Sequence, residues 1–200
     1  HFCAAERQFR TPLSYGAVRT PTAQWTATAA GCCILGAQAE GPYITHVTRG
    51  RIVDLGVTDM TNMGAAMAPA AFDTLQAVFR DTGTVPGDYD LILTGDLGDV
   101  GSRIVLELFA REGVALENYT DCGLLLYDRK RQDMHAGGSG CGCSAAVLCG
   151  YLLPEMRRGR WRRVLFAPTG ALLSPTSSFQ GESIPGICHA VVLDRTKEGA

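Results

Sequence analysis

The sequence predicts an α/β protein in which helices cover the faces of a sheet. Strand-sized apolar runs alternate with amphipathic helical patterns along the chain. Hydrophobic residues make up 46% of the 200 residues and charged residues only 19%, which is enough apolar material for a sizeable core. No low-complexity linker and no internal repeat divides the chain. We therefore expect one compact unit with the element order β-β-α-β-α-α-β-β.

The first half of this order begins after residues 1–30, which lack any useful periodicity and are interpreted as the end of a preceding unit. Gly31–Gln38 and Tyr43–Leu55 are apolar or alternating and are parted by a turn at Gly41-Pro42. They are predicted to be adjacent antiparallel strands. Gly50 interrupts the second strand and is expected to mark a bulge.

Two helices and a strand follow. Apolar residues recur at helical spacing from Asn62 onward, and Gly83 is the expected stop. Tyr89–Thr94 is a short apolar strand, and a second helix is predicted to end near Gly113. The apolar run Cys122–Tyr127 fits either a helix or a strand. The helical spacing depends on Met67, Ala71, Leu75, Val78 and Phe79 in the first helix and on Ile104, Val105, Leu108 and Phe109 in the second.

The last part of the chain starts with a tract of Gly, Ser, Ala and Cys over His135–Cys143, which is predicted to open a helix. Val164–Ala167 and Ile187–Leu193 are expected to close the chain as strands, with a long hydroxyl-rich loop over Pro168–Ser183 between them. The buried stripe of the helix is expected to contain Val147, Leu148, Tyr151 and Leu152.

Charge and cysteine content narrow the class of protein. A net charge of −2 and a pI near 6.1 give no overall attraction to nucleic acid or anionic lipid. No apolar run reaches the roughly 18–20 residues that span a bilayer, so we expect a soluble or peripheral protein. The chain begins at His1 without a signal-peptide pattern and is interpreted as a fragment or processed product. The eight cysteines lie beside core-forming residues, which favours reduced, mostly structural thiols in a reducing compartment.

The glycine-rich tract is a candidate site for an anion or an acyl carbonyl. Glycine permits close approach of the backbone to a ligand, and a helix N-terminus presents unpaired N–H groups and a positive dipole end. The alternative is that small residues let the helix pack tightly on the sheet. Zinc at the Cys141-x-Cys143 motif is disfavoured because a second ligand pair is absent at the usual spacing. The candidate ligand contacts in the tract are His135, Gly138, Ser139 and Cys141.

Further candidates lie in three other segments. Asp96 follows the strand ending at Thr94, where α/β sheets place their sites, although an Asp here also commonly caps the next helix. The long loop contributes Ser174 and Ser177 as candidate contacts, with a plain surface loop as the alternative. A basic run fits contact with anionic lipid or a partner, or else a solvated face. Its cationic residues are Arg157, Arg158, Arg160, Arg162 and Arg163.

Several long strings together resemble the stage V sporulation protein AD family of endospore-forming bacteria over nearly all 200 residues. They are HFCAAERQFR, RTPTAQWT, NMGAAMAPAA, DLILTGDLG, HAGGSGCGCSA and LLSPTSS with GESIPGICHAVV. That family is similar to thiolases and ketoacyl synthases. The resemblance therefore implies a layered α-β-α-β-α fold, with residues 1–30 ending the first half and 31–200 forming the second. It also implies that the segment with the thiolase nucleophilic cysteine precedes His1.

The resemblance implies binding rather than condensation. Condensing enzymes carry a His or Asn near the position of Gly140-Cys141 and another His near that of Asp96, to handle protons and stabilise an oxyanion. Both positions differ here, and a carboxylate repels an oxyanion. An active acyltransferase acting on acyl thioesters remains the alternative function, and a structural scaffold with a vestigial pocket is a third.

The implied ligand is dipicolinic acid, taken up with Ca²⁺ in sporulation and released at germination. Its carboxylates suit backbone N–H groups around Gly137–Cys143, while Asp96 and Asp99 are expected metal ligands only if it binds as the calcium salt. The resemblance also implies no cofactor, a peripheral place on the spore inner membrane, other stage V sporulation membrane proteins as partners, and a homodimer.

Overall fold

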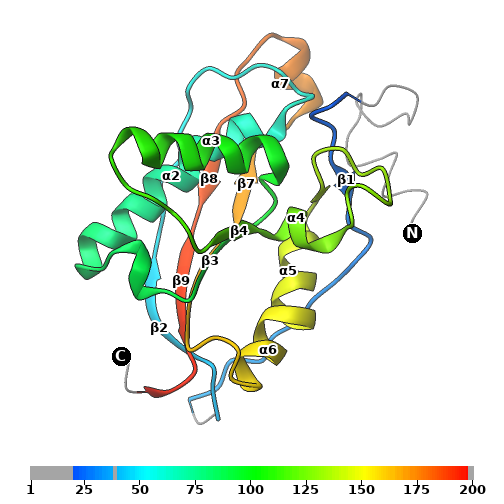
Figure 1. Cartoon of the computed structure of the whole chain (residues 1–200). Helices are drawn as coiled ribbons and strands as arrows, with labels where there is room; N and C mark the ends of the chain where they lie inside the picture. Colours follow the sequence, from blue (N-terminus) through cyan, green and yellow to red (C-terminus); the bar gives the residue numbers. More distant parts are fainter. Residues whose placement is uncertain (1–19, 38–39, 198–200) are drawn as a thin grey trace.

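The computed structural model describes residues 20–37 and 40–197, and a five-stranded mixed sheet forms its centre (Figure 1). The strand order is β2-β9-β6-β3-β4; β6, β3 and β4 are parallel, whereas β9 is antiparallel to both its neighbours. The strands of this sheet are β2 (Tyr43–Thr48), β3 (Leu91–Thr94), β4 (Tyr119–Asp121), β6 (Arg163–Ala167) and β9 (Ala190–Asp194).

Two smaller strand pairs flank the sheet. A parallel pair joins β1 (Trp25–Thr26) to β5 (Gly138–Ser139), and an antiparallel hairpin joins β7 (Thr169–Ala171) to β8 (Gly186–Cys188). The helices are α2 (Met63–Thr82), η1 (Pro86–Asp88), α3 (Gly98–Arg111), α4 (Cys122–Leu126), α5 (Cys143–Val147), the π-helical turn η2 (Leu148–Leu152), α6 (Leu153–Arg157) and α7 (Pro175–Phe179).

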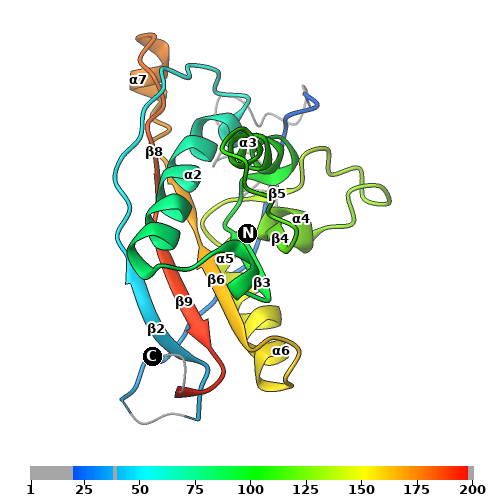
Figure 2. The same cartoon turned by 60° about the vertical axis from the view of Figure 1, so that its left-hand side comes forward.

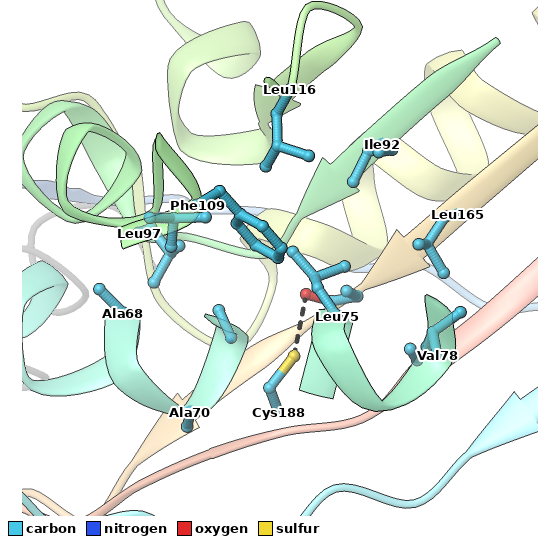
Figure 3. Close-up of a cluster of buried hydrophobic side chains, with 14 of the residues drawn as sticks. Ala68, Ala70, Leu75, Val78, Ile92, Leu97, Phe109, Leu116, Leu165 and Cys188 are labelled. Carbon is cyan, nitrogen blue, oxygen red and sulfur yellow. Dashed lines mark hydrogen bonds between the residues drawn. The ribbon is translucent and has the colours of Figure 1, made fainter. Parts of the chain in front are cut away.

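Alternating side chains give the sheet two buried faces. In β3, Ile92 belongs to the core beneath α2 and α3, whereas Leu93 belongs to the core beneath α5 and α6. Figure 3 shows the first of these cores, where Phe109 packs with Leu75 and Leu165. Helices therefore cover both faces, as Figure 2 shows. This arrangement confirms the α/β class predicted from the sequence.

The first predicted helix is confirmed as α2 with both of its ends. The Asn62 side chain accepts a hydrogen bond from the Ala65 N–H, and Gly83 adopts the left-handed conformation that ends the helix. Its small residues allow close packing against α3. A Cβ added to Gly101 would lie 2.7 Å from the carbonyl oxygen of Gly64, so the two helices cross at these glycines.

The predicted strand Gly31–Gln38 is wrong for the residues that the structure describes. Residues 31–37 form neither strand nor helix, and they lie on the surface with Ile34 97% exposed. Their apolar content predicted a buried strand, but no neighbouring strand pairs with them. Cys32 and Cys33 are consequently exposed rather than structural core thiols.

The expected bulge at Gly50 is also wrong, because β2 ends earlier, at Thr48, and its irregularity falls between Ile44 and His46. Gly50 instead permits close approach of the chain to the carbonyl of Cys188, where a Cβ would not fit. The glycine at position 50 is therefore required by a close backbone contact and not by a bulge.

The expected loop over Pro168–Ser183 is partly regular. It continues into β7 and then forms α7, so that β7, α7 and β8 make an extension beyond the sheet (Figure 1). The ambiguous run after Asp121 is α4, and the short strand β4 before it was not predicted. Three residues are too few to show an alternating pattern. The proposed boundary near residue 30 stays a prediction, and residues 1–19 lie outside the described part.

Candidate functional site

The candidate site lies where β3 ends, beside β5 and the start of β7. Parallel strands β3 and β6 bring their carboxyl ends to one edge of the sheet, which is where α/β proteins place ligands. Asp96 follows β3, and Thr169 follows β6. The β1–β5 pair presents Ser139 to the same place. The fold thus brings together two of the predicted residues, Asp96 and Ser139.

Asp96 is the centre of this arrangement. Its Oδ2 accepts hydrogen bonds from the Ser139 hydroxyl at 2.9 Å and from the Gly140 N–H at 3.0 Å. Its Oδ1 accepts from the Thr169 hydroxyl at 3.2 Å. Three donors from two separate segments therefore converge on one carboxylate. The capping role considered for Asp96 is filled by a different residue.

That residue is Asp121, which sequence reasoning missed. Its carboxylate accepts from the N–H groups of Leu97 and Gly98, each at 2.9 Å, at the start of α3. It also accepts from the Gly123 N–H at the start of α4 and from the Thr94 hydroxyl. Because it is fully buried, its pKa is raised to about 6 despite these donors. An Asp directly before a run of small and apolar residues was the signal available in the sequence.

The glycine-rich tract uses its polar backbone groups within the protein. Gly137 and Gly140 have φ values of 104° and 99°, a region that favours glycine. The N–H of Gly137 donates to the Met134 carbonyl, and that of Cys143 donates to the Gly140 carbonyl. Gly138 is buried against the Tyr127 ring. The tract therefore packs tightly and contacts the carboxylate of Asp96, whereas the ligand site expected there stays a prediction.

The cysteines near the site differ in exposure. Cys141 is exposed, whereas Cys122 and Cys143 are buried. Burial raises the pKa of the Cys122 thiol well above its ordinary value, and the nearby carboxylate of Asp121 raises it further. Although Cys122 begins a helix, it is therefore held as a neutral thiol and is a poor nucleophile.

Two of the described histidines contact backbone groups of other segments. The Nδ1 of His135 lies 2.7 Å from the Thr20 carbonyl oxygen, and its Nε2 lies 3.4 Å from Asp133. The Nδ1 of His189 accepts from the Gly50 N–H. His1 lies outside the described residues.

The other predicted residues occupy separate places. Asp99 pairs with Arg103 at 2.9 Å and with Arg129 at 2.8 Å, so each of its oxygens faces a guanidinium group. Ser174 precedes α7 and Ser177 lies within it, at the tip of the β7–β8 extension (Figures 1 and 2). Within residues 20–37 and 40–197, no cluster of three or more His, Cys, Asp or Glu side chains is suited to a metal ion.

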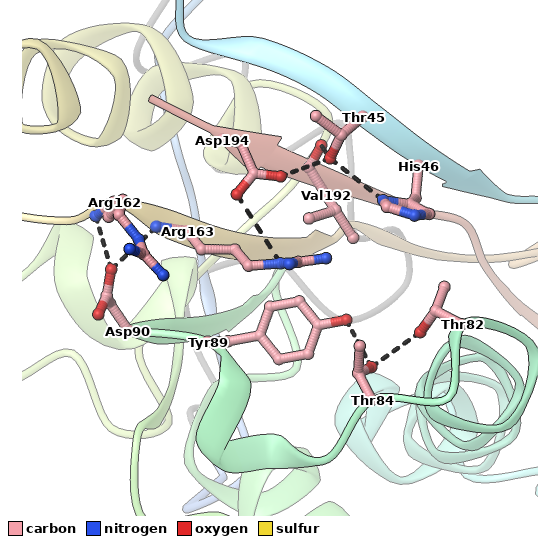
Figure 4. A network of polar contacts seen from close by, with 10 residues as sticks. All are labelled: Thr45, His46, Thr82, Thr84, Tyr89, Asp90, Arg162, Arg163, Val192 and Asp194. Atoms are coloured by element: carbon pink, nitrogen blue, oxygen red, sulfur yellow. Dashed lines mark hydrogen bonds and ion pairs between the residues drawn. The ribbon is translucent and has the colours of Figure 1, made fainter. Parts of the chain in front are cut away.

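The basic run lies at the opposite end of the sheet. Arg158 and Arg160 pair with Glu155, and Arg160 also lies over the Trp161 ring. Arg163 points inward to Asp194, with Nε 3.8 Å from Oδ1, and its guanidinium lies over the Tyr89 ring (Figure 4). Arg157 and Arg162 are exposed, as are the paired Arg158 and Arg160.

A surface cavity of about 250 Å³ lies beside this run. Arg157 and Arg195 line it together with residues 40–42. The Arg195 N–H donates to the Arg162 carbonyl, so the end of β9 adds a further exposed cation to the basic run. No helix in the described part of the chain is long and apolar enough to cross a membrane.

Residues 1–194 match the family described as stage V sporulation protein AD. The stage V sporulation protein AD of Bacillus subtilis (strain 168) is 46% identical over 196 residues, which cover 98% of this chain. The chain spans 58% of the length of that relative.

Two solved structures of condensing enzymes share part of the arrangement. The 3-oxoacyl-[acyl-carrier-protein] synthase III from Aquifex aeolicus VF5 has a TM-score of 0.41 and 13% identity, over 78% of this chain and 46% of that one. AbyA1, a tetronic acid condensing enzyme, has a TM-score of 0.45 and 15% identity, over 80% of this chain and 49% of that one. At these scores the likeness carries no inference about the chemistry of the site.

Proposed function

Because the chain belongs to the stage V sporulation protein AD family, we propose that it is a non-catalytic subunit that binds dipicolinic acid in a transport assembly of the spore inner membrane. The assembly takes up dipicolinate in sporulation and releases it at germination. The observation that carries the proposal is the convergence of hydroxyl and amide donors on a carboxylate, Asp96, at the end of β3. These are the groups that recognise a carboxylate ligand.

The internal carboxylate sets a condition on the ligand. A carboxylate of dipicolinate placed beside ionised Asp96 is repelled unless a cation lies between them. Calcium, as part of the cargo, supplies that cation, since it prefers carboxylate and carbonyl oxygens. Asp96 is the proposed contact for calcium, and Ser139 is the proposed contact for the ligand. Asp99 joins them only if its pairs with Arg103 and Arg129 open.

The site favours binding over acyl transfer. Nucleophilic catalysis needs an activated thiol or hydroxyl beside a base. The raised pKa of Cys122 keeps it protonated. His135 contacts the Thr20 carbonyl, and His189 accepts from the Gly50 N–H. A negative Asp96 would also oppose an oxyanion at this position.

The test is a calorimetric titration of dipicolinic acid into the natural protein, with and without Ca²⁺. Saturable heat is expected to be stronger with Ca²⁺, and lost in Asp96→Ala and Ser139→Ala. Ser178→Ala in α7 is the matched control, because the backbone N–H and carbonyl of Ser178 make hydrogen bonds that the substitution keeps. Unchanged binding in both site variants would show that dipicolinic acid does not bind at Asp96 and Ser139. Turnover of an acyl thioester without ligand heat would instead indicate an acyltransferase, and partner binding alone would indicate a scaffold.

The basic run supports a proposed peripheral contact with the membrane. Arg157, Arg162 and Arg195 are exposed and lie together at one end of the molecule. Each cation near an anionic leaflet adds about 1 kcal/mol of attraction. Arg157→Glu with Arg162→Glu should abolish co-sedimentation with anionic vesicles. Arg80→Glu, an exposed residue of α2, should not. Equal binding by the double variant would remove this surface from the membrane contact.

The proposed partners are other stage V sporulation membrane proteins and a second copy of the same protein. The exposed apolar side chains Ile34, Val47 and Leu55 are available for such contacts. Sedimentation equilibrium of the natural protein tests the dimer, and a monomer at all concentrations contradicts it.

A further inference from the structure

Two cysteines far apart in the sequence meet at the surface. The Sγ atoms of Cys33 and Cys149 lie 3.4 Å apart, although 116 positions separate the residues. Cys33 is exposed and Cys149 is partly exposed, so small molecules in solvent can reach the pair. Both thiols are free, and Cys149 belongs to the π-helical turn η2. The proposed function uses neither of them.

The sulfur–sulfur contact is the last of three successive contacts between residues 29–33 and residues 142–149. Gly142 packs against the Ala29 carbonyl, and a Cβ added to Gly31 would lie 2.5 Å from the Ala145 oxygen. Cys33 then meets Cys149. The partners on the helical side are spaced by three and four residues, which places them on one helical face. Their partners Ala29, Gly31 and Cys33 are spaced by two residues, as expected of an extended chain.

This matched spacing holds residues 29–33 in register along α5 and η2. A Cβ at Gly31 would also lie 2.9 Å from the Cys149 sulfur, so the glycine lets the two sulfurs approach. The segment follows β1 directly, and the Ala27 N–H donates to the Ser139 carbonyl. The thiol pair therefore lies at the end of a segment that begins at β1, the strand that pairs with β5 beside the candidate site.

We propose that Cys33 and Cys149 are a redox modification site that forms an intramolecular disulfide and clamps residues 29–33 onto the helix. The oxidant is a low-molecular-weight disulfide. Cys33, as the exposed thiolate, attacks one sulfur of the oxidant and releases one thiol. Cys149 loses its proton, attacks the Cys33 sulfur of the mixed disulfide and releases the second thiol. Two cysteine thiols are oxidised, and one disulfide is reduced to two thiols.

The pair is a dithiol in a reducing interior and closes as the surroundings become oxidising. The hydrogen bond with Cys149 is the main cause of a raised pKa of the Cys33 thiol, followed by burial. Because the thiolate is the reacting form, the rate of closure is expected to rise with pH above neutrality.

The experiment incubates the natural protein with oxidised glutathione, blocks free thiols by alkylation, and maps disulfide-linked peptides by mass spectrometry. A peptide joining Cys33 to Cys149 is expected. It should disappear in Cys33→Ser and Cys149→Ser and persist in the matched control Cys32→Ser, which changes the adjacent exposed cysteine. Oxidation should raise the midpoint of thermal unfolding on the order of 5–10 °C in the natural protein and the control only.

Three results would overturn the proposal. The first is a stable glutathione adduct on Cys33 with no disulfide to Cys149. The second is a disulfide that joins Cys149 to Cys32 in place of Cys33. The third is the formation of disulfides between molecules only. Peptide mapping of the unsubstituted protein decides among these outcomes even if a serine variant fails to fold.

Discussion

The hydroxyl of Ser139 lies 2.9 Å from Oδ2 of Asp96, and this hydrogen bond joins the glycine-rich tract to the end of β3 across 43 positions of sequence. Ser139 is buried and Asp96 is partly buried, so the bond is shielded from competing water. The Gly140 N–H and the Thr169 hydroxyl also donate to that carboxylate.

Ser139→Ala should lower the free energy of unfolding by about 1.5–3 kcal/mol, the range for a hydrogen bond to a charged group. Urea denaturation checks this value, and Ser178→Ala should change it by less than about 0.5 kcal/mol. A double-mutant cycle with Asp96→Asn should show coupling between the two positions. Strict additivity would contradict a direct bond.

The pH dependence of stability should carry the signature of Asp121. Burial raises its pKa from the ordinary 3.8 to about 6 in the folded protein. The folded state therefore holds a proton that the unfolded state has released over this interval. Its contribution to stability is full below pH 3.8 and is lost as the pH rises through about 6, with a total on the order of 3 kcal/mol.

Carbon-13 NMR titration of the Asp121 carboxyl measures this pKa directly. Denaturation at pH 5 and pH 7 should show Asp121→Asn gaining stability, relative to the natural protein, at the higher pH. A carboxyl that titrates near 4 would show that the four donors to Asp121 outweigh its burial.

The crossing of α2 and α3 should be intolerant of a methyl group. Gly101→Ala places a Cβ 2.7 Å from the Gly64 carbonyl oxygen, and overpacking of this kind costs about 1–3 kcal/mol. Gly150→Ala is the matched control, because nothing lies within 4 Å of its added Cβ. The control should be neutral or stabilising by up to about 1 kcal/mol. Equal melting temperatures for the two variants would contradict close helix packing.

The inward-pointing pair in Figure 4 should be sensitive to loss of its acid. Asp194 is 4% exposed and accepts from the Thr45 hydroxyl at 2.6 Å, besides facing Arg163. Asp194→Ala leaves the Arg163 guanidinium without this acid, which should lower the unfolding free energy by about 3 kcal/mol. Asp88→Ala, which removes the exposed acid at the end of η1, should have a smaller effect. Chemical denaturation measures both, and equal losses would argue against the buried pair.

Much of the fold was predictable because its signals are local. Asn62 and Gly83 mark the ends of α2, and the apolar run before Asp96 marks β3, since capping and periodicity act within a few residues. The segment at Ile34 was misassigned because apolar composition alone does not say whether a strand partner is present. The short β4 ended in the buried Asp121 and carried too little pattern to predict.

The sequence by itself determined the α/β class, the family, the main helices and the candidates Asp96 and Ser139. Tertiary structure decided which candidates meet. In the folded chain, Ser139 and Thr169 donate hydrogen bonds to Asp96. Asp99 pairs with two arginines, and Ser174 and Ser177 lie in the β7–β8 extension. The physical reason is that strand order and crossovers set distances between segments, and these depend on packing of the whole chain rather than on local pattern.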